Sequence, residues 1–264
     1  MRYSINVYNI MIKVMSSSLG NGLKNVTGAQ CFFNSTLQAI RHCRPIVSSL
    51  IDSTGNNING SFHGALVNLL FDGCTINDLR NVLLQMKEKL GMNPRLQNDA
   101  HECMLQIINI LFPDLSKCPM AGKLKSTIHC ERCGESVTVQ ESLSQSLPIY
   151  TTNIIDGLEL FEQSSEAGNC EKCNSKQTQT LSFDPNQVYV IHLKRKKIMS
   201  PPKELGDDFK LLAAVIHYGT SSFGHYITYV VKDDHVLRCD DESVTKYNLF
   251  PDDVPVYMLF YIRK

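Results

Sequence analysis

Two pairs of cysteines, each with two residues between its members, constrain the fold of this chain more than any other feature. The pairs are separated by 36 residues and comprise Cys130 with Cys133 and Cys170 with Cys173. Each pair can present two thiolates to one tetrahedral Zn²⁺, with each sulfur about 2.3 Å from the metal. Gly134 and Asn174 follow the pairs and tolerate the positive φ that a tight turn requires. The spacing predicts one structural zinc site, although two pairs of reduced, buried cysteines would give the same pattern.

The cysteine content also bears on where the protein is found. A secreted domain held by disulfides is normally shorter and denser in cysteine than this chain, which has ten in 264 residues. Its N-terminus mixes Asn, Lys and Ser with apolar residues, so it lacks the apolar segment of a secretion signal. No stretch approaches the roughly 18 apolar residues of a membrane-spanning helix. We therefore expect an intracellular protein of the cytoplasm or nucleus, with reduced thiols and no membrane attachment.

The charges of the chain balance, with 26 Lys and Arg residues against 26 Asp and Glu residues. Proteins that coat nucleic acids need a basic excess to neutralise phosphates, so we expect no nucleic-acid partner. The hydrophobic content of 43% is that of a globular chain. A chain of this length can bury a sizeable core, in one large domain or two small ones.

The first 115 residues carry mainly helical patterns. Apolar residues recur with a helical period across 75–90, which opens with a capping-box pattern. Shorter helices are expected over 31–40, which Pro45 stops, and over 98–111.

The rest of the chain carries short alternating or β-branched segments separated by turn residues. The expected strands are 136–140, 145–150, 178–183, 187–193, 211–217, 225–231 and 255–262. A helical half followed by a strand-rich half predicts an α+β fold rather than alternating βαβ units.

Cys31 is a candidate nucleophile because it opens an expected helix. The dipole and the free N–H groups at such an end favour a thiolate, which is the working form of a cysteine nucleophile. His225 starts an expected strand, and a hairpin to the next strand would bring Asp240 beside it to fix the imidazole tautomer. Asn25 lies in the loop before the helix, where its amide could donate to an oxyanion.

Each of these residues also has a purely structural interpretation. A free cysteine is more often a small buried hydrophobic residue, and a histidine in a strand is usually only hydrogen-bonded. Two aspartates after a strand usually form a turn. The spacing of these residues alone does not decide between such structural roles and a cysteine–histidine enzyme.

Six motifs follow one another in an order that is typical of one enzyme family. They are Gly22-Leu23-Lys24-Asn25 through Leu37-Gln38, Gln97-Asn98-Asp99-Ala100-His101-Glu102, the two cysteine pairs, 188–195, 214–226 with Gly224-His225-Tyr226, and Asp240-Asp241-Glu242-Ser243-Val244. In this order they resemble the ubiquitin-specific proteases, the papain-like cysteine deubiquitinases of peptidase family C19. The resemblance runs from Gly22 to the last residue, and the chain looks like a compact, divergent member.

The resemblance implies a papain-like fold with a helical thumb, an antiparallel β palm and zinc-ribbon β fingers. Residues 1–21 would be a flexible leader in front of a catalytic domain of 22–264. The implied boundaries are about 22–118 for the thumb, 119–185 for the fingers, and 186–264 with part of 136–150 for the palm.

The resemblance also implies hydrolysis of the isopeptide or peptide bond after the C-terminal glycine of ubiquitin. Cys31 would attack the carbonyl, His225 would accept and return the proton, and Asp240 would orient the imidazole. Asn25 and the backbone N–H of Cys31 would hold the oxyanion, with Asp241 in support. No organic cofactor is implied, and the only metal would be the structural zinc.

Ubiquitin and ubiquitinated proteins are the implied partners, and the enzyme is expected to be a monomer. Asp99 would pair with the basic tail of ubiquitin across the thumb–palm cleft, and Tyr226 is a second expected substrate contact. A narrow channel for the diglycine end would exclude bulkier peptides. His217, which precedes His225 by eight residues, is interpreted as structural.

The loop before the nucleophile departs from the family pattern. Family members usually place one residue between the loop asparagine and the next glycine, whereas Val26 and Thr27 both follow Asn25 here. One extra residue can redirect an amide. Gln30 also replaces the usual Thr or Ser before the nucleophile. Two alternatives therefore stay open: a protease for a ubiquitin-like modifier, and a catalytically inactive ubiquitin-binding scaffold.

Overall fold

The computed structural model describes residues 21–53, 61–70, 75–220 and 223–264. The expected leader therefore lies outside the described residues except for Asn21, and Cys74 lies outside them as well. In the described ranges, no helix has the length and apolar character needed to cross a membrane.

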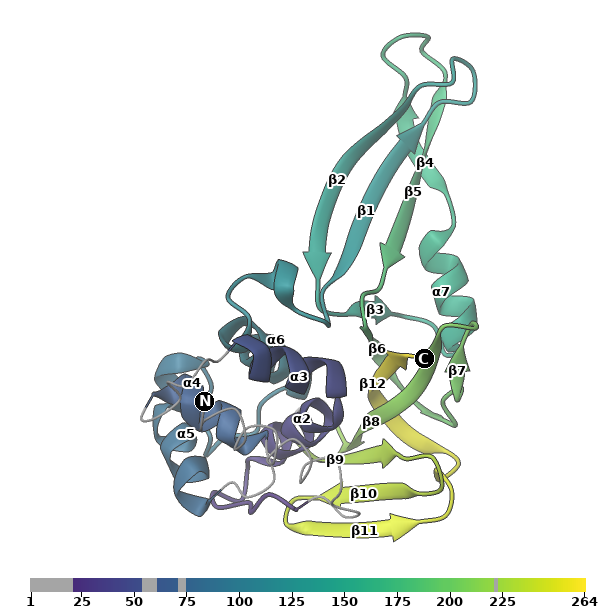
Figure 1. Ribbon diagram of the computed structural model, residues 1–264. Helices are drawn as coiled ribbons and strands as arrows, with labels where there is room; N and C mark the ends of the chain where they lie inside the picture. Colours follow the sequence, from purple (N-terminus) through teal and green to yellow (C-terminus); the bar gives the residue numbers. More distant parts are fainter. Residues whose placement is uncertain (1–20, 54–60, 71–74, 221–222) are drawn as a thin grey trace.

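Helices dominate the first part of the chain and gather on one side of the molecule (Figure 1). They are α2 (Cys31–His42), α3 (Arg44–Ser53), α4 (Phe62–Leu69), α5 (Ile76–Lys89) and α6 (Ala100–Leu111), followed by the 3₁₀ turn η1 (Leu115–Lys117).

An eight-stranded sheet lies beside the helices. In spatial order its strands are β11 (Ser243–Tyr247), β10 (Val236–Asp240), β9 (Gly224–Val231), β8 (Phe209–Gly219), β12 (Val254–Arg263), β6 (Val188–Met199) and β3 (Leu147–Ile149), with β7 (Glu204–Leu205) paired to β8. Neighbouring strands run antiparallel except β3 and β6. The last of these strands in sequence, β12, therefore lies in the interior of the sheet.

A second sheet forms a narrow arm that extends away from the rest of the molecule (Figure 1). In spatial order its four strands are β2 (Ser136–Ser144), β1 (Gly122–His129), β5 (Lys176–Asp184) and β4 (Ser165–Asn169). Helix α7 (Ile154–Glu162) packs at the base of the arm against β3 and β5. Because β2 and β4 are exposed along most of their length, the arm has little apolar core of its own.

The main core joins the helices to one face of the large sheet. Helix α2 is buried from its first residue to Arg41 and packs against α6, β8 and β9. Along β12, alternate side chains face opposite sides, as the period of a strand requires. Met258 and Phe260 belong to the core shared with the helices, whereas Leu259 and Tyr261 belong to a second cluster.

The predicted α+β fold is confirmed, and so are the expected helices at α5 and α6. Helix α5 begins with a capping box in which Thr75 and Asp78 bond to each other's backbone N–H. Pro45 does not end α2, which stops at His42. It lies instead in the first turn of α3, where a missing N–H removes no helical hydrogen bond.

The sequence patterns did not predict α3, α4, α7, β1, β4, β7 or β11. Helix α7 does carry a signal, because Asn153 caps it and Ile154, Leu158 and Phe161 follow a helical spacing. Strands β1 and β4 carry little, because a strand with both faces near solvent shows no clear apolar alternation.

Substitution of a buried leucine in α2 tests the placement of this helix. Leu37 is fully buried, so Leu37→Ala is expected to lower the free energy of unfolding by about 2–5 kcal/mol. The side chain of Leu84 in α5 is 85% exposed. Leu84→Ala should therefore change that free energy by less than about 0.5 kcal/mol. Urea unfolding followed by circular dichroism measures both, and equal losses would contradict the central position of α2.

Candidate active site

Cys31 is the first residue of α2 and is buried at the junction of the helices and the large sheet. The N–H groups of Phe33 and Asn34 donate to the carbonyl of Gln30 and so begin the helix. The N–H of Cys31 itself has no acceptor among the described residues. The thiol therefore lies at the positive end of the helix dipole, beside a free backbone donor.

His225 and Asp240 meet because strands β9 and β10 pair. Cys239 pairs with Thr228, so the next residue, Asp240, lies opposite Ile227. His225 is then its diagonal neighbour on the same side of the hairpin. His225 Nε2 lies 2.6 Å from Asp240 Oδ1, so the carboxylate holds one nitrogen of the ring.

The imidazole of His225 also interacts with the thiol of Cys31. This contact, joined by the contact with Asp240, raises the pKa of His225 to about 9, although partial burial opposes the shift. The imidazole is therefore protonated at neutral pH. A protonated imidazole beside a thiol favours the thiolate form.

Arg238 holds the second oxygen of Asp240. Its Nη2 lies 2.6 Å from Asp240 Oδ2, and both groups are partly buried. Burial acts to raise the pKa of Asp240, but the bonds from His225 and Arg238 outweigh it and lower that pKa below its ordinary value. The carboxylate therefore stays ionised and has a fixed orientation.

Asn25 is held at both ends of its side-chain amide. Its Nδ2 donates to Asp241 Oδ2 at 2.9 Å, and its Oδ1 accepts the N–H of Gln30 at 3.3 Å. Asp241 Oδ1 accepts from Asn34 Nδ2 at 2.8 Å, and the carbonyl of Asp241 accepts the N–H of Leu23 at 2.8 Å. The second N–H of the Asn25 amide has no acceptor among the described residues.

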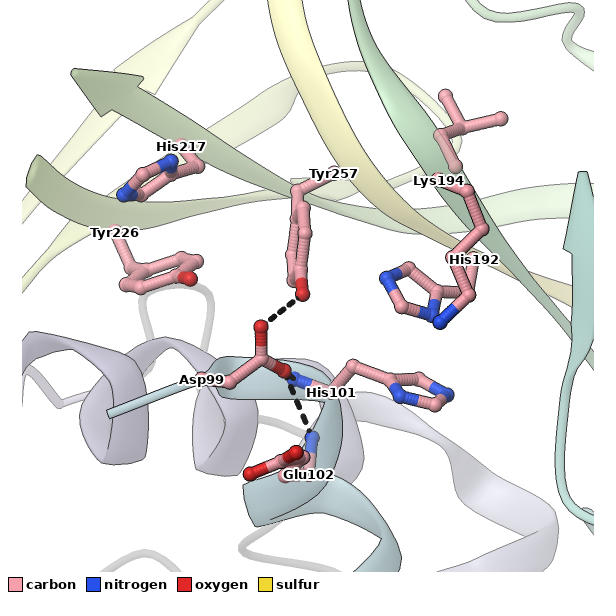
Figure 2. A pocket seen from close by; sticks show the side chains of 9 residues that line it. Asp99, His101, Glu102, His192, Lys194, His217, Tyr226 and Tyr257 are labelled. Atoms are coloured by element: carbon pink, nitrogen blue, oxygen red, sulfur yellow. Dashed lines mark hydrogen bonds between the residues drawn. The ribbon is translucent and has the colours of Figure 1, made fainter. Parts of the chain in front are cut away.

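A pocket of about 310 Å³ opens between α6 and the large sheet (Figure 2). It is lined by Asp99, His101, Glu102, His192, Leu193, Lys194, His217, Tyr226 and Tyr257. The two residues expected to contact substrate, Asp99 and Tyr226, thus share this pocket. Acidic, aromatic and imidazole groups converge in it from both the helices and the sheet.

Asp99 joins α6 to β12 and caps the helix. Its Oδ1 accepts the N–H groups of His101 at 2.8 Å and Glu102 at 2.9 Å. Its Oδ2 accepts the hydroxyl of Tyr257, and Figure 2 shows the two groups pointing toward each other. The carboxylate of Glu102, in contrast, is exposed in the pocket and has no partner among the described residues.

His217 and Tyr226 form a buried wall of the pocket. They pair in the register of β8 and β9, and their rings lie 4.2 Å apart. His225 pairs with Tyr218 in the same register, so alternation places His217 and His225 on opposite sides of the hairpin. The structure thus brings His225, and not His217, to Asp240.

The four predicted zinc ligands meet at the far end of the arm. Their sulfur atoms all lie within 4.8 Å of one another, with 3.5 Å between Cys130 and Cys173 and 3.6 Å between Cys133 and Cys170. Tetrahedral zinc with sulfur at about 2.3 Å requires neighbouring sulfurs to be about 3.8 Å apart. The cluster therefore fits this metal.

The two turns that carry these cysteines have the same backbone pattern. In each turn the N–H of the first cysteine donates to the carbonyl five residues later, at 2.8 Å and 2.7 Å. Gly134 and Asn174 have the positive φ values expected of them, 72° and 56°. An ion pair of 2.6 Å between Lys172 and Glu135 links one turn to the other.

Four further cysteines pack in the core. They are Cys43, Cys103, Cys118 and Cys239, and all are buried. Desolvation raises the pKa of each of these thiols, to about 11 for Cys118 and about 12 for Cys239, so they stay protonated and unreactive.

Sequence patterns alone did not single out several residues of the site. Gln30 and Asn34 are four residues apart at a helix start, which is a spacing that brings side chains together. Arg238 and Asp240 are two residues apart in one strand, so their side chains lie on the same side of it. Tyr257 gives no local signal, because its partner Asp99 lies 158 residues away.

Comparison with known protein families places the chain in one of them. The chain belongs to the ubiquitin carboxyl-terminal hydrolase family, whose model matches residues 21–261. Ubiquitin carboxyl-terminal hydrolases 23 and 21 of Arabidopsis thaliana are 23% and 28% identical to it over 97% and 96% of this chain. The chain spans less than half of these two relatives, 37% and 43% of their length. Hydrolase 4 of the same plant is 26% identical, and the match covers 82% of both proteins.

Solved structures share the fold. The SAGA DUB module Ubp8/Sgf11/Sus1/Sgf73 bound to monoubiquitin contains a chain that matches with a TM-score of 0.76 at 18% identity, over 99% of this chain and 75% of that chain. The module bound to ubiquitin aldehyde matches with a TM-score of 0.73 at 19% identity, over 99% and 74%. These likenesses confirm the predicted fold.

Removal of the Asp240 carboxylate tests the electrostatics of the site. In Asp240→Ala, the pKa of His225 is expected to fall from about 9 toward its ordinary value near 6.5, because the ring loses an anionic partner. Between these two pH values, His225 would therefore be neutral in Asp240→Ala but still protonated in the wild type. An NMR titration of histidine-labelled protein measures the shift, with Asp156→Ala, an exposed site in α7, as the control. An unchanged pKa in Asp240→Ala would contradict the contact.

Proposed function

We propose that the chain is a thiol-dependent ubiquitin hydrolase that cleaves the isopeptide or peptide bond after the C-terminal glycine of ubiquitin. The observation that carries the proposal is the contact of Cys31, His225 and Asp240 within a domain of this family. Two solved structures with the same fold are bound to monoubiquitin and to ubiquitin aldehyde, which supports ubiquitin as the partner.

The first chemical step forms a thioester. The Cys31 thiolate attacks the carbonyl carbon of the terminal glycine, and the electron pair of the C=O bond moves to oxygen. As the C–N bond breaks, the His225 imidazolium gives its proton to the departing lysine nitrogen. Asp240 keeps the ring oriented through Nε2 during this transfer.

The second step releases ubiquitin. Neutral His225 now takes a proton from a water molecule, which attacks the thioester carbonyl. The C–S bond breaks, the glycine carboxylate leaves, and the thiolate–imidazolium pair is restored. The high pKa of His225 in the free enzyme favours this final state.

Two donors support the oxyanion in both steps. The free N–H of Cys31 and the free N–H of the Asn25 amide lie at the start of α2, and Asp241 fixes the amide. Fixed donors of this kind stabilise the developing charge more than water does, because they need no reorientation.

The pocket beside α6 provides a path for the ubiquitin tail. Its acidic groups suit a basic peptide, and Glu102 can pair directly because its carboxylate is free. Asp99 would act through its charge while its oxygens hold Tyr257 and the start of α6. Tyr226 would pack against the tail from the wall of the sheet.

We further propose that the four-cysteine cluster binds one structural Zn²⁺. Zinc would be held by Cys130, Cys133, Cys170 and Cys173 and would join the two turns at the end of the arm. Four thiolate ligands leave no open position on the metal, so its role is structural rather than catalytic. This support matters because the arm has little apolar core.

The thumb, fingers and palm boundaries, about 22–118, 119–185 and 186–264 with part of 136–150, remain part of the proposal. The groups proposed for catalysis all come from one chain, which supports action as a monomer. Reduced cysteines at the nucleophile and at the cluster suit an intracellular setting, in the cytoplasm or nucleus.

A fluorogenic amide of ubiquitin tests the activity. The wild-type protein, freshly reduced, is expected to release the fluorophore, and Cys31→Ala should lower the rate by about 10³-fold or more because no thiolate remains. Cys118→Ala, which removes a buried thiol away from the site, serves as the control.

The outcome of this assay separates the alternatives. Full turnover by Cys31→Ala, or none by the wild type, would refute the proposal. Parallel vinyl-sulfone probes of ubiquitin and of ubiquitin-like modifiers then report the preferred modifier. Binding of ubiquitin without labelling of Cys31 would indicate a scaffold instead.

Metal analysis tests the zinc proposal. The purified protein is expected to hold about one zinc per chain, and Cys170→Ser should lose it because three ligands remain. Cys118→Ser is the matched control, since it removes a buried cysteine that lies outside the cluster. Inductively coupled plasma mass spectrometry measures the zinc content per chain. Full retention of zinc by Cys170→Ser would refute the assignment.

A further inference from the structure

The loop before Cys31 is built around the side chain of Gln30. This side chain is fully buried and makes no capping bond to its own helix. It points back into the loop, where its Oε1 accepts the N–H groups of Val26 at 3.1 Å and Thr27 at 3.2 Å. Its Nε2 donates to the carbonyl of Lys24 at 2.8 Å. One side chain thus bonds to three successive parts of the loop backbone.

These contacts fall where the loop carries its extra residue. Val26 and Thr27 both stand between Asn25 and Gly28, and Gln30 binds the N–H group of each. The segment that contains the extra residue therefore folds around the side-chain amide of Gln30. Without that acceptor, two partly buried N–H groups would be left unsatisfied, which is costly enough to reshape a loop.

Gln30 also belongs to a closed ring of hydrogen bonds around Asn25. Its backbone N–H donates to Asn25 Oδ1 at 3.3 Å, and its Nε2 donates to Asn34 Oδ1 at 3.2 Å. Asn34 Nδ2 donates to Asp241 at 2.8 Å, and Asp241 accepts from Asn25 Nδ2 at 2.9 Å. A displacement of Gln30 would therefore shift the Asn25 amide in two ways, directly through the backbone N–H of Gln30 and indirectly through Asn34 and Asp241.

We propose that Gln30 is a positioning residue for oxyanion stabilisation, which holds the Asn25 amide beside the nucleophile despite the longer loop. The inference rests on the proposed hydrolase function. Gln30 is buried inside the loop, so it acts through Asn25 rather than on the substrate. Buried polar groups that are fully hydrogen-bonded in this way fix a single local geometry.

The test compares turnover with a reaction that forms no oxyanion. Gln30→Met keeps the size of the side chain and removes its amide. We expect kcat for the fluorogenic ubiquitin amide to fall by about 10- to 100-fold, with KM changed by less than about 3-fold. The rate at which iodoacetamide alkylates Cys31 should stay within about 2-fold of wild type, because alkylation depends on the thiolate alone.

A double-mutant cycle shows whether Gln30 acts through Asn25. Asn25→Ala is expected to lower kcat by about 10²-fold, since one oxyanion donor is lost. Gln30→Met should have little further effect in that background, because residues that act through one contact are not additive. Independent, multiplicative losses would overturn the proposal.

Gln38 supplies the matched control. It is a second buried glutamine of α2, and it donates to the carbonyl of Asn21 at 3.0 Å without touching the loop. Gln38→Met should keep kcat near the wild-type value. An equal loss in Gln38→Met, or a parallel loss of alkylation in Gln30→Met, would overturn the positioning role.

The outcomes also separate this inference from the proposed function. A wild type without turnover refutes the hydrolase itself, whereas an active wild type with an unchanged Gln30→Met refutes only the positioning role. If Gln30→Met does not fold, Gln30→Leu decides, because it also removes both the acceptor and the donor of the side-chain amide. A lower kcat with normal alkylation in Gln30→Leu supports the proposal, and a wild-type kcat overturns it.

Discussion

The site depends on the docking of helix α2 against strand β9. The proposed nucleophile is at the start of the helix and the proposed base is at the start of the strand, so the thiol and the imidazole meet only where these two elements pack together. Thr228, fully buried in β9, donates its hydroxyl to the Ser35 carbonyl at 2.7 Å and fixes the helix to the strand. Gly22 packs the loop before α2 against the turn after β10, because a Cβ there would lie 2.2 Å from the Glu242 carbonyl oxygen. Close backbone approach is therefore part of the packing around Cys31 and His225.

Two adjacent aspartates serve different partners because the backbone turns between them. Asp240 ends β10 in extended form, whereas Asp241 has a φ of 50°. The turn directs the first carboxylate to His225 and Arg238 and the second to Asn25. The carboxylate that orients the proposed base and the carboxylate that fixes the proposed oxyanion donor are thus kept apart.

The sequence predicted those parts of the site that depend on local spacing. The start of a helix at Cys31, the hairpin that carries Asp240 and the four-cysteine cluster are all of this kind. It did not predict contacts between distant segments, such as the bond from Tyr257 to Asp99, or the inward turn of Gln30. It also did not predict strands β1 and β4 of the arm, because their solvent-exposed faces give no alternation of apolar residues.

The position of β12 has a consequence for the order in which the protein acquires activity. This strand is synthesised after every other described strand, yet it lies between β6 and β8 in the sheet that supports the histidine. A chain still emerging from the ribosome therefore has its thiol long before the sheet can close around the base. Pairing of such distant segments is slow compared with helix formation, so the nascent chain carries the thiol of Cys31 before the sheet that positions His225 is complete. Chains truncated before Val254 would be held in that state.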